Sequence, residues 1–505
     1  MFQYTLTGVS RFRIWCILCY CFTLLCAGGA PVHAAAGHQA DWAAIDQYVE
    51  AMMRADRVPG AAVAIVKNDS IVHLKGFGVA GPDGQPVTPQ TPFLLGSMSK
   101  SFTALAIMQL VEAGKLDLDA PVLHYLPWFR VADPSATARI TLRHLLHHTS
   151  GIPTKAPRAE GVPLTLEAHV RALQTVQLQH EPGTSHEYAS PNYQVLGAII
   201  EAVTQQSFGD YIQQHVFTPL NMHQSYVSYP DAQTQGLSQG HQLWFGYPIA
   251  ADLPYEVDRQ PTASLIASVE DLARYEIAQL NGGQGETARV LSADGVRQLH
   301  HPVAPGEDYI YAMGWRVGTI HGVNAVHHGG VLPNYRGKMV LLPDTGWGVV
   351  VLTNVSSFVG RPTSHDLADG IATMLVGGAA APSTLSLSRL YLLLTIGLLL
   401  ITANQVKDGL LVGRWHARVR PHLGSRSTYI RHIVVPIALE LAIPIVLVVG
   451  LPYVLGFSLR TFFQQIPDLS SWLALTAGLG FTIGMLKLAL IGRSHLRQRH
   501  AGVPK

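Results

Sequence analysis

The chain has 505 residues, of which only 13% are charged, and its mean hydropathy is positive at +0.20. Ordinary soluble proteins carry roughly 25% charged residues, so this composition argues against a wholly soluble protein and favours membrane segments. The net charge of +2 hides an uneven distribution, because residues 381–505 carry 13 Lys/Arg and only three Asp/Glu. A basic segment that is also strongly apolar is typical of membrane topology rather than of nucleic-acid binding.

Residues 1–36 have the pattern of an export signal. Two arginines, Arg11 and Arg13, precede an apolar run over residues 14–25, and small residues follow up to Ala36. Cleavage near Ala34 or Ala36 would remove all four cysteines, which lie within the first 26 residues, and would leave no disulfide and no thiolate metal site. The alternative is an uncleaved membrane anchor.

Residues 37–380 are predicted to form one globular domain. Helical spacing covers residues 42–54, and two strand-like runs at 61–66 and 71–77 flank Asn68, which predicts a hairpin. Four later runs are expected to be consecutive strands of one antiparallel sheet: 315–317, 326–331, 338–342 and 348–353. The pattern predicts an α+β fold with an antiparallel sheet.

A short polar segment, Gly96-Ser97-Met98-Ser99-Lys100, stands directly before the apolar run of residues 102–111. The run is too long for one strand and ends near Gly114, which predicts a buried helix with Ser97 at its entrance and Lys100 one turn further on. A helix N-terminus supplies positive potential, and a desolvated lysine can accept the serine proton. Ser-x-x-Lys also arises by chance, so assigning the nucleophile depends on companion motifs.

Three histidines, His144, His147 and His148, precede a Thr-Ser-Gly turn, and their spacing raises the question of a metal site. Because no nearby carboxylate completes a ligand set, we predict no metal and no cofactor, and a turn at the rim of a cleft instead. Tyr188 lies shortly before a predicted helix over residues 194–203. It is either a packing residue or a member of a proton network with a serine and a lysine.

The segment from His327 to Tyr335 combines a strand pattern with two glycines, Gly329 and Gly330. Glycines inside a strand mark a place where a ligand or another chain approaches the backbone. This is what a substrate-binding edge strand requires.

Three apolar segments follow, at about residues 385–403, 433–457 and 472–491. The loop 404–432 holds six Lys/Arg, so the positive-inside rule puts this loop and the C-terminal tail in the cytoplasm. Three spans in residues 381–505 then place residues 37–380 on the periplasmic or extracellular side of the membrane. They predict a multi-pass protein of the inner membrane that contacts lipid. Glu440, within the second segment, is either a functional group or a residue that faces a neighbouring helix.

Four motifs occur in the order seen in serine β-lactamase-like proteins: Gly96 to Lys100, Leu145 to Gly151, Tyr188-Ala189-Ser190 and His328-Gly329-Gly330. Over about residues 40–380 the chain resembles this family, which includes class C β-lactamases, penicillin-binding proteins, D-aminopeptidases and esterases. The resemblance implies a sheet flanked by helices, with a mostly helical domain beside it and a cleft between them. The order of signal, catalytic domain and three spans further resembles membrane-bound prodrug-maturation peptidases of the colibactin-maturation type.

The resemblance also implies roles for individual residues. Ser97 attacks a carbonyl to form an acyl-enzyme, Lys100 accepts its proton, and Tyr188 passes protons to the leaving group and later helps to activate water. The oxyanion is expected between the main-chain N–H groups of Ser97 and of Val331, which follows Gly330.

Substrate contacts are less fixed by the resemblance. Ser190 and Asn334 are expected to be polar contacts, although Asn334 has the alternative role of shaping a turn. His328, or alternatively His327, stands where many relatives carry a lysine that binds a substrate carboxylate, and Ser190 stands where an asparagine is usual. Both departures argue against an efficient β-lactamase.

The expected function is therefore that of a membrane-anchored serine hydrolase that acts outside the cytoplasm. Its expected substrate is a peptide or amide that contains a D-amino acid, such as a peptide capped by N-acyl-D-asparagine, with no nucleic-acid partner. The alternatives are a cell-wall carboxypeptidase or penicillin-binding protein, an esterase, and a slowly acylated sensor of peptidoglycan or β-lactams.

Overall fold

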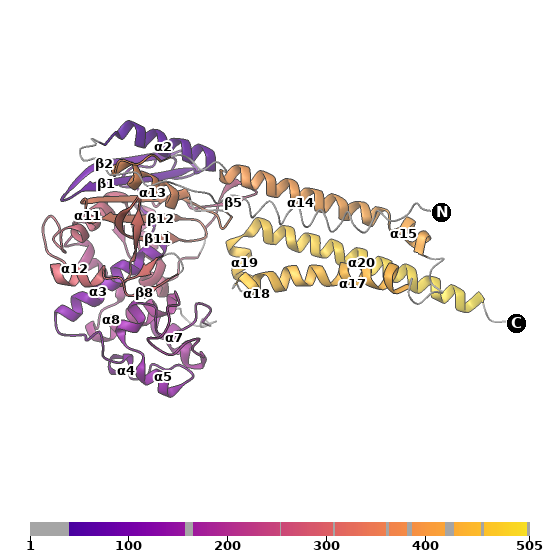
Figure 1. The fold of residues 1–505 in the computed structure, drawn as a ribbon, viewed down its shortest axis with the longest axis horizontal. Coiled ribbons are helices and arrows are strands. Elements are labelled where there is room, and N and C mark those ends of the chain that lie inside the picture. Colours follow the sequence, from indigo (N-terminus) through magenta and orange to yellow (C-terminus); the bar gives the residue numbers. More distant parts are fainter. Residues whose placement is uncertain are drawn as a thin grey trace. The chain divides into compact units, whose positions relative to one another are not determined.

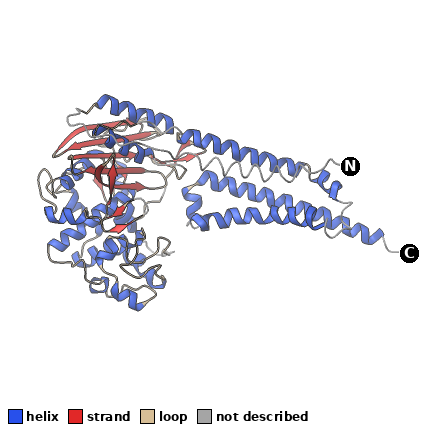
Figure 2. Ribbon diagram, in the orientation of Figure 1, coloured by secondary structure: helices blue, strands red, loops and turns tan. Residues whose placement is uncertain are grey.

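The computed structural model describes residues 40–156, 165–252, 254–306, 309–359, 363–380, 386–419, 429–455 and 459–501. The predicted export signal lies outside these residues. A central antiparallel sheet has the strand order β2-β1-β13-β12-β11-β10-β9-β8 (Figure 2). In that order the strands are Ser70–Gly78, Gly60–Lys67, Trp347–Thr353, Arg336–Leu342, Val323–Val331, Arg316–Ile320, Ile310–Tyr311 and Ala304–Pro305.

The predicted strands are confirmed. The hairpin of β1 and β2 turns at Asn68, whose φ of 56° is one that asparagine adopts more readily than most residues. The other four predicted runs form β10 to β13, which pair as neighbours in chain order. Strands β12 and β13 are buried over almost their whole length because helices cover both faces of the sheet.

Two pairs of helices form these covering layers (Figure 1). On one face, α2 (Trp42–Asp56) and α13 (Thr363–Leu375) share a hydrophobic core with alternate residues of the central strands. On the other face, α11 (Val269–Leu280) and α3 (Ser99–Glu112) pack in a second, larger core. The predicted α+β fold, with an antiparallel sheet between helices, is thus confirmed.

Short helices, turns and two small sheets complete this part of the chain. The small sheets consist of β3 (Phe93–Leu94), β7 (Ile266–Ala267) and β4 (Ser225–Tyr226), and of β14 (Val355–Ser356), β5 (His241–Trp244) and β6 (Tyr247–Ala250). The remaining helices are α4 (Val122–Tyr125), α5 (Pro134–Arg139), α6 (Leu142–Leu146), α7 (Leu166–Arg171), α8 (Ser190–Thr204), α9 (Phe208–Ile212), α10 (Tyr229–Thr234) and α12 (Ala293–Leu299).

The C-terminal part is helical. Its helices are α14 (Leu387–Leu410), α15 (Val412–Val419), α17 (Val435–Ile445), α18 (Leu451–Leu455), α19 (Leu459–Gln465) and α20 (Pro467–Ala501). In the described part of the chain, α14 and the Pro467–Ser494 portion of α20 are the two helices long and apolar enough to cross a membrane. The second predicted span falls on a helical stretch that π-turns at Ile430–Val434 and Val446–Gly450 divide, so it is not one uninterrupted α-helix.

The two long apolar helices run in the same direction. Trp472 Nε1 of α20 donates a 2.9 Å hydrogen bond to Thr402 Oγ1 of α14, and Gln405 Nε2 of α14 donates a 3.3 Å bond to the Thr476 carbonyl. Residue numbers increase together along both helices at these contacts. The chain between the two helices must therefore return in the opposite direction.

The returning stretch contains α17 and packs against α20. Glu440 forms an ion pair with Lys487, and Ile437 shares a small hydrophobic cluster with Ile491. Here residue numbers rise in one helix as they fall in the other, so the two are antiparallel. Of the two roles considered for Glu440, the contact with a neighbouring helix is the one observed.

The first turn of α14 is built into the sheet domain. The amide of Leu387 donates a 2.7 Å hydrogen bond to the Asp56 carboxylate at the end of α2. Tyr391 is buried in the core that α2 and α13 share with the sheet, and its hydroxyl lies 2.9 Å from Ser357 Oγ. The helix therefore starts within the packed domain.

Candidate active site

Ser97 and Lys100 lie where the sequence predicts. Ser97 is in a 3-10 turn, Gly96–Met98, that leads directly into α3. The Nζ atom of Lys100 is 3.2 Å from Ser97 Oγ, 3.4 Å from Ser190 Oγ and 3.0 Å from the main-chain oxygen of Thr262. Lys100 is fully buried, whereas Ser97 is half-buried, so the hydroxyl is the accessible member of the pair.

The surroundings of Lys100 favour its neutral form. Burial, followed by the positive charges of Arg259 and Arg316, holds the pKa of its amine well below the usual value. A neutral amine can donate one N–H to the Thr262 carbonyl and one to Ser190. Its lone pair then remains for the proton of Ser97, which is the geometry of a general base.

Thr262 belongs to a π-helical turn, Gln260–Ser264, that other elements hold in place. Thr103 Oγ1 of α3 donates a 2.7 Å hydrogen bond to the Pro261 carbonyl. Gln194 Nε2 of α8 donates a 3.1 Å bond to the carbonyl of Asp258, just before the turn. No sequence motif marks this segment, because a main-chain acceptor has no side-chain signature.

Tyr188 lies on the other side of the Ser97–Lys100 pair. Its ring centroid lies 5.0 Å from Lys100 Nζ, and its buried hydroxyl makes no well-aligned hydrogen bond with another described group. Burial raises the pKa of the phenol, while the nearby Arg316 charge and the Ser97 hydroxyl lower it. A protonated tyrosine facing the serine can pass a proton to a leaving group.

The three histidines of the 144–148 segment do not converge. Helix α6 ends at Leu146, and His148 has a φ of 56°, which directs it away from His144. Among the described residues, no group of three His, Cys, Asp or Glu side chains could hold a metal ion. Instead, His148 Nδ1 lies 3.2 Å from the Ala189 amide and 3.0 Å from Asn192 Nδ2, so it orders the segment that carries Tyr188.

The end of β11 forms the wall opposite Ser97. Strand β10 pairs with β11 only as far as His327, which leaves the outer edge of the next residues without a partner strand in the described sheet. A Cβ atom at Gly330 would lie 1.9 Å from the Leu95 carbonyl, and one at Gly96 would lie 2.6 Å from the Val331 amide nitrogen. These glycines let two segments of the main chain, around Gly96 and Gly330, approach closely, and this brings the Val331 N–H beside Ser97.

His328 is the histidine that faces the site. It is fully buried, its Nε2 lies 3.2 Å from the Tyr311 hydroxyl, and its Nδ1 lies 2.9 Å from the Gly329 carbonyl. The carbonyl requires a proton on Nδ1, so Nε2 accepts from Tyr311. Burial and the Arg316 charge lower the imidazole pKa, which keeps His328 neutral. His327 lies on the other face of the strand.

Arg316 is a site residue that sequence reasoning missed. Its guanidinium carbon lies 4.2 Å from the Tyr309 ring centroid and 5.4 Å from that of Tyr188. No ion pair joins it to a carboxylate among the described residues, and its buried Nε has no hydrogen-bond partner there. The short strands around it carried no motif that could have identified it.

Asn334 is held by the protein itself. Its Nδ2 donates a 2.8 Å hydrogen bond to the Ala251 carbonyl at the end of β6, and its main-chain oxygen accepts one of 3.2 Å from the His241 amide. Asn334 is only 5% exposed. These contacts favour the turn-shaping alternative over a direct contact with substrate.

Comparisons with known proteins cover this same region. The family model described as Beta-lactamase matches residues 45–374. Protein flp of Staphylococcus aureus (strain MW2) is 30% identical over 326 residues, which are 64% of this chain and 65% of that protein, so the chain spans just under two thirds of this relative. Penicillin-binding protein 4 of Amycolatopsis lactamdurans is 30% identical over 60% of this chain and 83% of its own length. The structure of an octameric penicillin-binding protein homologue from Pyrococcus abyssi superposes with a TM-score of 0.59 and 27% identity, over 67% of this chain and 78% of that one.

Proposed function

Because the chain belongs to the β-lactamase family of serine hydrolases, we propose that it hydrolyses peptides or amides containing a D-amino acid, through an acyl-enzyme on Ser97. The observation that carries the proposal is the 3.2 Å contact between Ser97 Oγ and the buried amine of Lys100. A neutral lysine at this distance gives a serine its nucleophilic character.

Each proton in the proposed reaction has a donor and an acceptor. Lys100 takes the Ser97 proton as Oγ attacks the amide carbonyl, and the N–H groups of Ser97 and Val331 bind the oxyanion. The leaving amine receives a proton through Tyr188 as the C–N bond breaks. Water then gives a proton back to the same network as its oxygen attacks the ester, which releases the acid and restores Ser97.

An amide is a better candidate than an ester for two reasons. An amine leaves only when it is protonated, and the Tyr188 hydroxyl facing Ser97 is placed for this. A relative named penicillin-binding protein binds, by its name, a cyclic amide. The finer possibility, removal of an N-acyl-D-asparagine cap from a peptide product, rests on the likeness to prodrug-maturation peptidases alone.

We further propose that the catalytic domain faces the outside of the inner membrane, tethered by three spans. Helices α14 and α20 run in the same direction, so if both cross the bilayer the chain of residues 430–455 crosses it between them in the other direction. The basic loop 404–432 and the tail then lie in the cytoplasm. Before the first span, an export signal within residues 1–36 would deliver the domain to the outer side.

The test uses the full chain, purified in detergent, with four reporters. These are an N-acyl-D-asparaginyl amide, its L form, a chromogenic cephalosporin and a short-chain aryl ester, each also incubated with Ser97→Ala. Preferential cleavage of the D-amide that is lost in Ser97→Ala is the expected result. Cleavage of the ester alone would replace the peptidase by an esterase, and acylation without turnover would point to a penicillin-binding protein or a sensor.

One observation favours a second candidate, a carboxypeptidase. His328 replaces the family lysine and carries no positive charge, but Arg316 places a guanidinium beside Tyr188 that forms no ion pair with a carboxylate of the described residues. Arginine binds carboxylates in a bidentate manner, so a peptide with a free C-terminus would suit this cation. Arg316→Gln is then expected to raise KM for a D-peptide acid but not for its amide. Arg297→Gln, which changes an exposed arginine paired with Asp294, is the matched control.

A further inference from the structure

The hairpin of β5 and β6 has an exposed aromatic face, and the guanidinium carbon of Arg57 lies 4.1 Å from the Tyr247 ring centroid on it. Trp244, Tyr247 and Ile249 are 39%, 62% and 52% exposed. Trp244 pairs with Tyr247, and Ile249 pairs with Gln242 two residues along, so all of them share one face of the hairpin. On the other face, Leu243 is buried in the core of the domain. One face thus fixes the hairpin to the domain while the other stays exposed.

The turn of this hairpin touches the beginnings of both long apolar helices. The Phe245 amide donates a 3.0 Å hydrogen bond to the Asp468 carboxylate at the start of α20. Gly246 lies against Tyr391 in the first turns of α14, where an added Cβ would be 2.8 Å from the Tyr391 Cβ atom. The hairpin therefore lies at the level where α14 and α20 would leave a bilayer.

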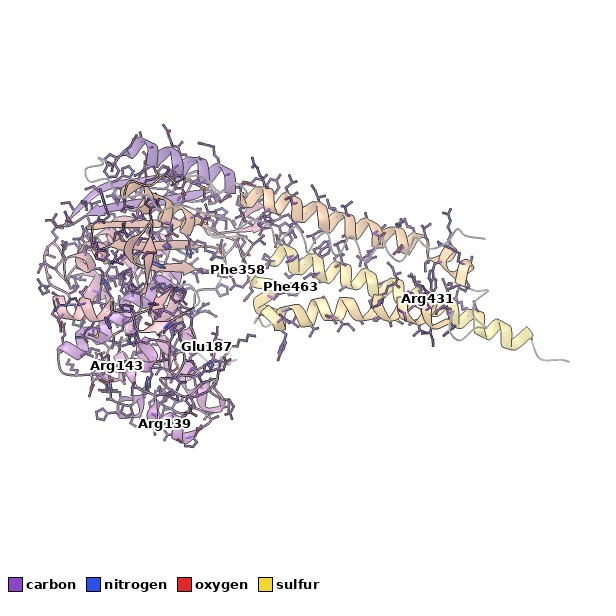
Figure 3. The ribbon with its side chains drawn as sticks, in the orientation of Figure 1. Arg139, Arg143, Glu187, Phe358, Arg431 and Phe463 are labelled. Atoms are coloured by element: carbon purple, nitrogen blue, oxygen red, sulfur yellow. The ribbon has the colours of Figure 1, made fainter. Side chains whose placement is uncertain are left out.

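Other aromatic side chains lie at the same end of the helical part. Tyr453 of α18 is 79% exposed and Phe463 of α19 is 39% exposed. Phe358 of the sheet domain packs against a cluster that contains Phe462, and Figure 3 shows Phe358 and Phe463 on facing sides of the two parts. Aromatic residues gathered at one level along membrane helices are the usual sign of the bilayer interface.

The conformation of the turn also keeps an aromatic ring at the tip. Phe245 has a φ of 47° and Gly246 a φ of 83°, as in a tight hairpin turn in which Asn-Gly is preferred. A bulky residue in this region of φ is unfavourable. Phe245 nevertheless occupies the position that faces the ends of the helices.

We propose that the β5–β6 hairpin is an interfacial anchor, whose face of Trp244, Tyr247 and Ile249 lies in the headgroup region of the bilayer that α14 and α20 cross. The occupant of this face is lipid, because the hairpin is continuous with the helix ends and because residues 241–250 contain no Asp, Glu, Lys or Arg. The inference rests on the membrane anchoring proposed above. Asn334 forms hydrogen bonds with Ala251 and His241, so the anchor also holds the loop after Val331 at a fixed height above the bilayer.

The test places a fluorophore that reports on lipid at single cysteines in the full chain, reconstituted in phosphatidylcholine vesicles. All four native cysteines, within the first 26 residues, are replaced by alanine. The hairpin positions are Tyr247→Cys and Ile249→Cys. Leu400→Cys, at a 67% exposed site in the middle of α14, reports on the span, and Ser135→Cys, at an exposed site on α5, reports on the distant side of the domain.

Lipids that carry a nitroxide either near the headgroup or near the chain end measure depth by quenching. The hairpin labels are expected to be quenched more by the headgroup nitroxide, Leu400→Cys more by the chain-end nitroxide, and Ser135→Cys by neither. No quenching at Leu400→Cys would overturn the membrane anchoring itself. Quenching at Leu400→Cys but not at the hairpin would overturn the anchor alone, and a blue-shifted hairpin label without quenching would assign this face to a second copy of the chain. Unchanged thermal unfolding of each labelled variant controls for folding.

Discussion

The Nζ atom of Lys100 donates a 3.0 Å hydrogen bond to the main-chain carbonyl of Thr262, a residue 162 positions further along the chain. A carbonyl accepts a hydrogen bond but carries no negative charge, so it positions the amine without stabilising the ammonium form as a carboxylate would. The site therefore combines a well-placed lysine with a lowered pKa.

Replacing Lys100 should separate activity from stability. Lys100→Met is expected to lower acylation by about 10²- to 10⁴-fold, because the general base is lost, and to raise the melting temperature at pH 7. Between the lowered pKa of Lys100 in the folded protein and the ordinary lysine pKa of 10.5, only the unfolded chain binds this proton. The free energy of unfolding should thus rise by about 1.4 kcal/mol per pH unit through that window in the native chain, and not in the variant. Lys115→Met, at an exposed site, is the control. If Lys100→Met has the same slope of unfolding free energy against pH as the native chain, the lowered pKa of Lys100 is refuted.

Removing one hydroxyl should test proton transfer at Tyr188. Tyr188→Phe keeps the ring beside Lys100 and is expected to lower kcat for an amide by about 10²- to 10⁴-fold. An aryl ester, whose leaving group needs no proton, should lose less. Tyr226→Phe removes a hydroxyl that donates a 2.8 Å hydrogen bond to Gln224 Oε1, and it serves as the matched control. Equal losses for amide and ester would contradict the role in leaving-group protonation.

Two glycines of the same sheet should respond in opposite ways to an added methyl group. Gly330→Ala places a Cβ 1.9 Å from the Leu95 carbonyl, so the wall of the oxyanion site must shift and activity should be lost. Gly318→Ala in β10 meets no atom within 4 Å and should leave activity unchanged. Steady-state rates and melting temperatures of both variants are the measurement. Comparable activity in the two would mean that the close approach has no role in catalysis.

Acid should destabilise the catalytic domain. Among the described residues, nine histidines have a lowered pKa in the folded protein, mainly through burial. The pKa is about 4 for His147 and His300 and about 3 for His327. The other six are His144, His148, His186, His241, His328 and His365. As the pH falls below 6.5, the unfolded chain binds protons that the folded one does not. Each group then removes about 1.4 kcal/mol of stability per pH unit until its folded pKa is reached.

The melting temperature measured from pH 8 to pH 5 checks this expectation. It should fall gradually down to about pH 6.5, where Lys100 is the group protonated on unfolding, and more steeply below that pH, where the histidines are protonated as well. His300→Gln should make the fall less steep, whereas His124→Gln, at an exposed site, should not. A melting temperature that does not change over this range would contradict the prediction.

Local patterns explain what could be predicted from the sequence. The spacing of Ser97 and Lys100 puts them on one helical face, since residues three apart on a helix are neighbours. The alternation around Asn68 predicted the first hairpin, and the glycines after His328 predicted the close approach of a backbone. Each of these inferences needs only the residues within one element.

The parts that were missed depend on contacts between distant elements. Thr262 acts through a main-chain atom, and Arg316 matters only because β10 begins beside Tyr188. The histidines near 148 are close in sequence, but the helix ends at Leu146 and separates them. In the second apolar segment, nothing in the composition of Val446–Gly450 indicates a π-turn in place of a regular helix.

The burial of Tyr391 in the core of the catalytic domain has a consequence for where the enzyme can work. A hydrolase on a flexible tether can sample a volume of the space above a membrane, whereas a domain fused to the start of its own span cannot. If α14 crosses the bilayer as proposed, Ser97 operates at one height above it. Amides held farther away in the cell wall would be out of reach whatever their chemistry, and suitable substrates would be those that diffuse to the membrane surface.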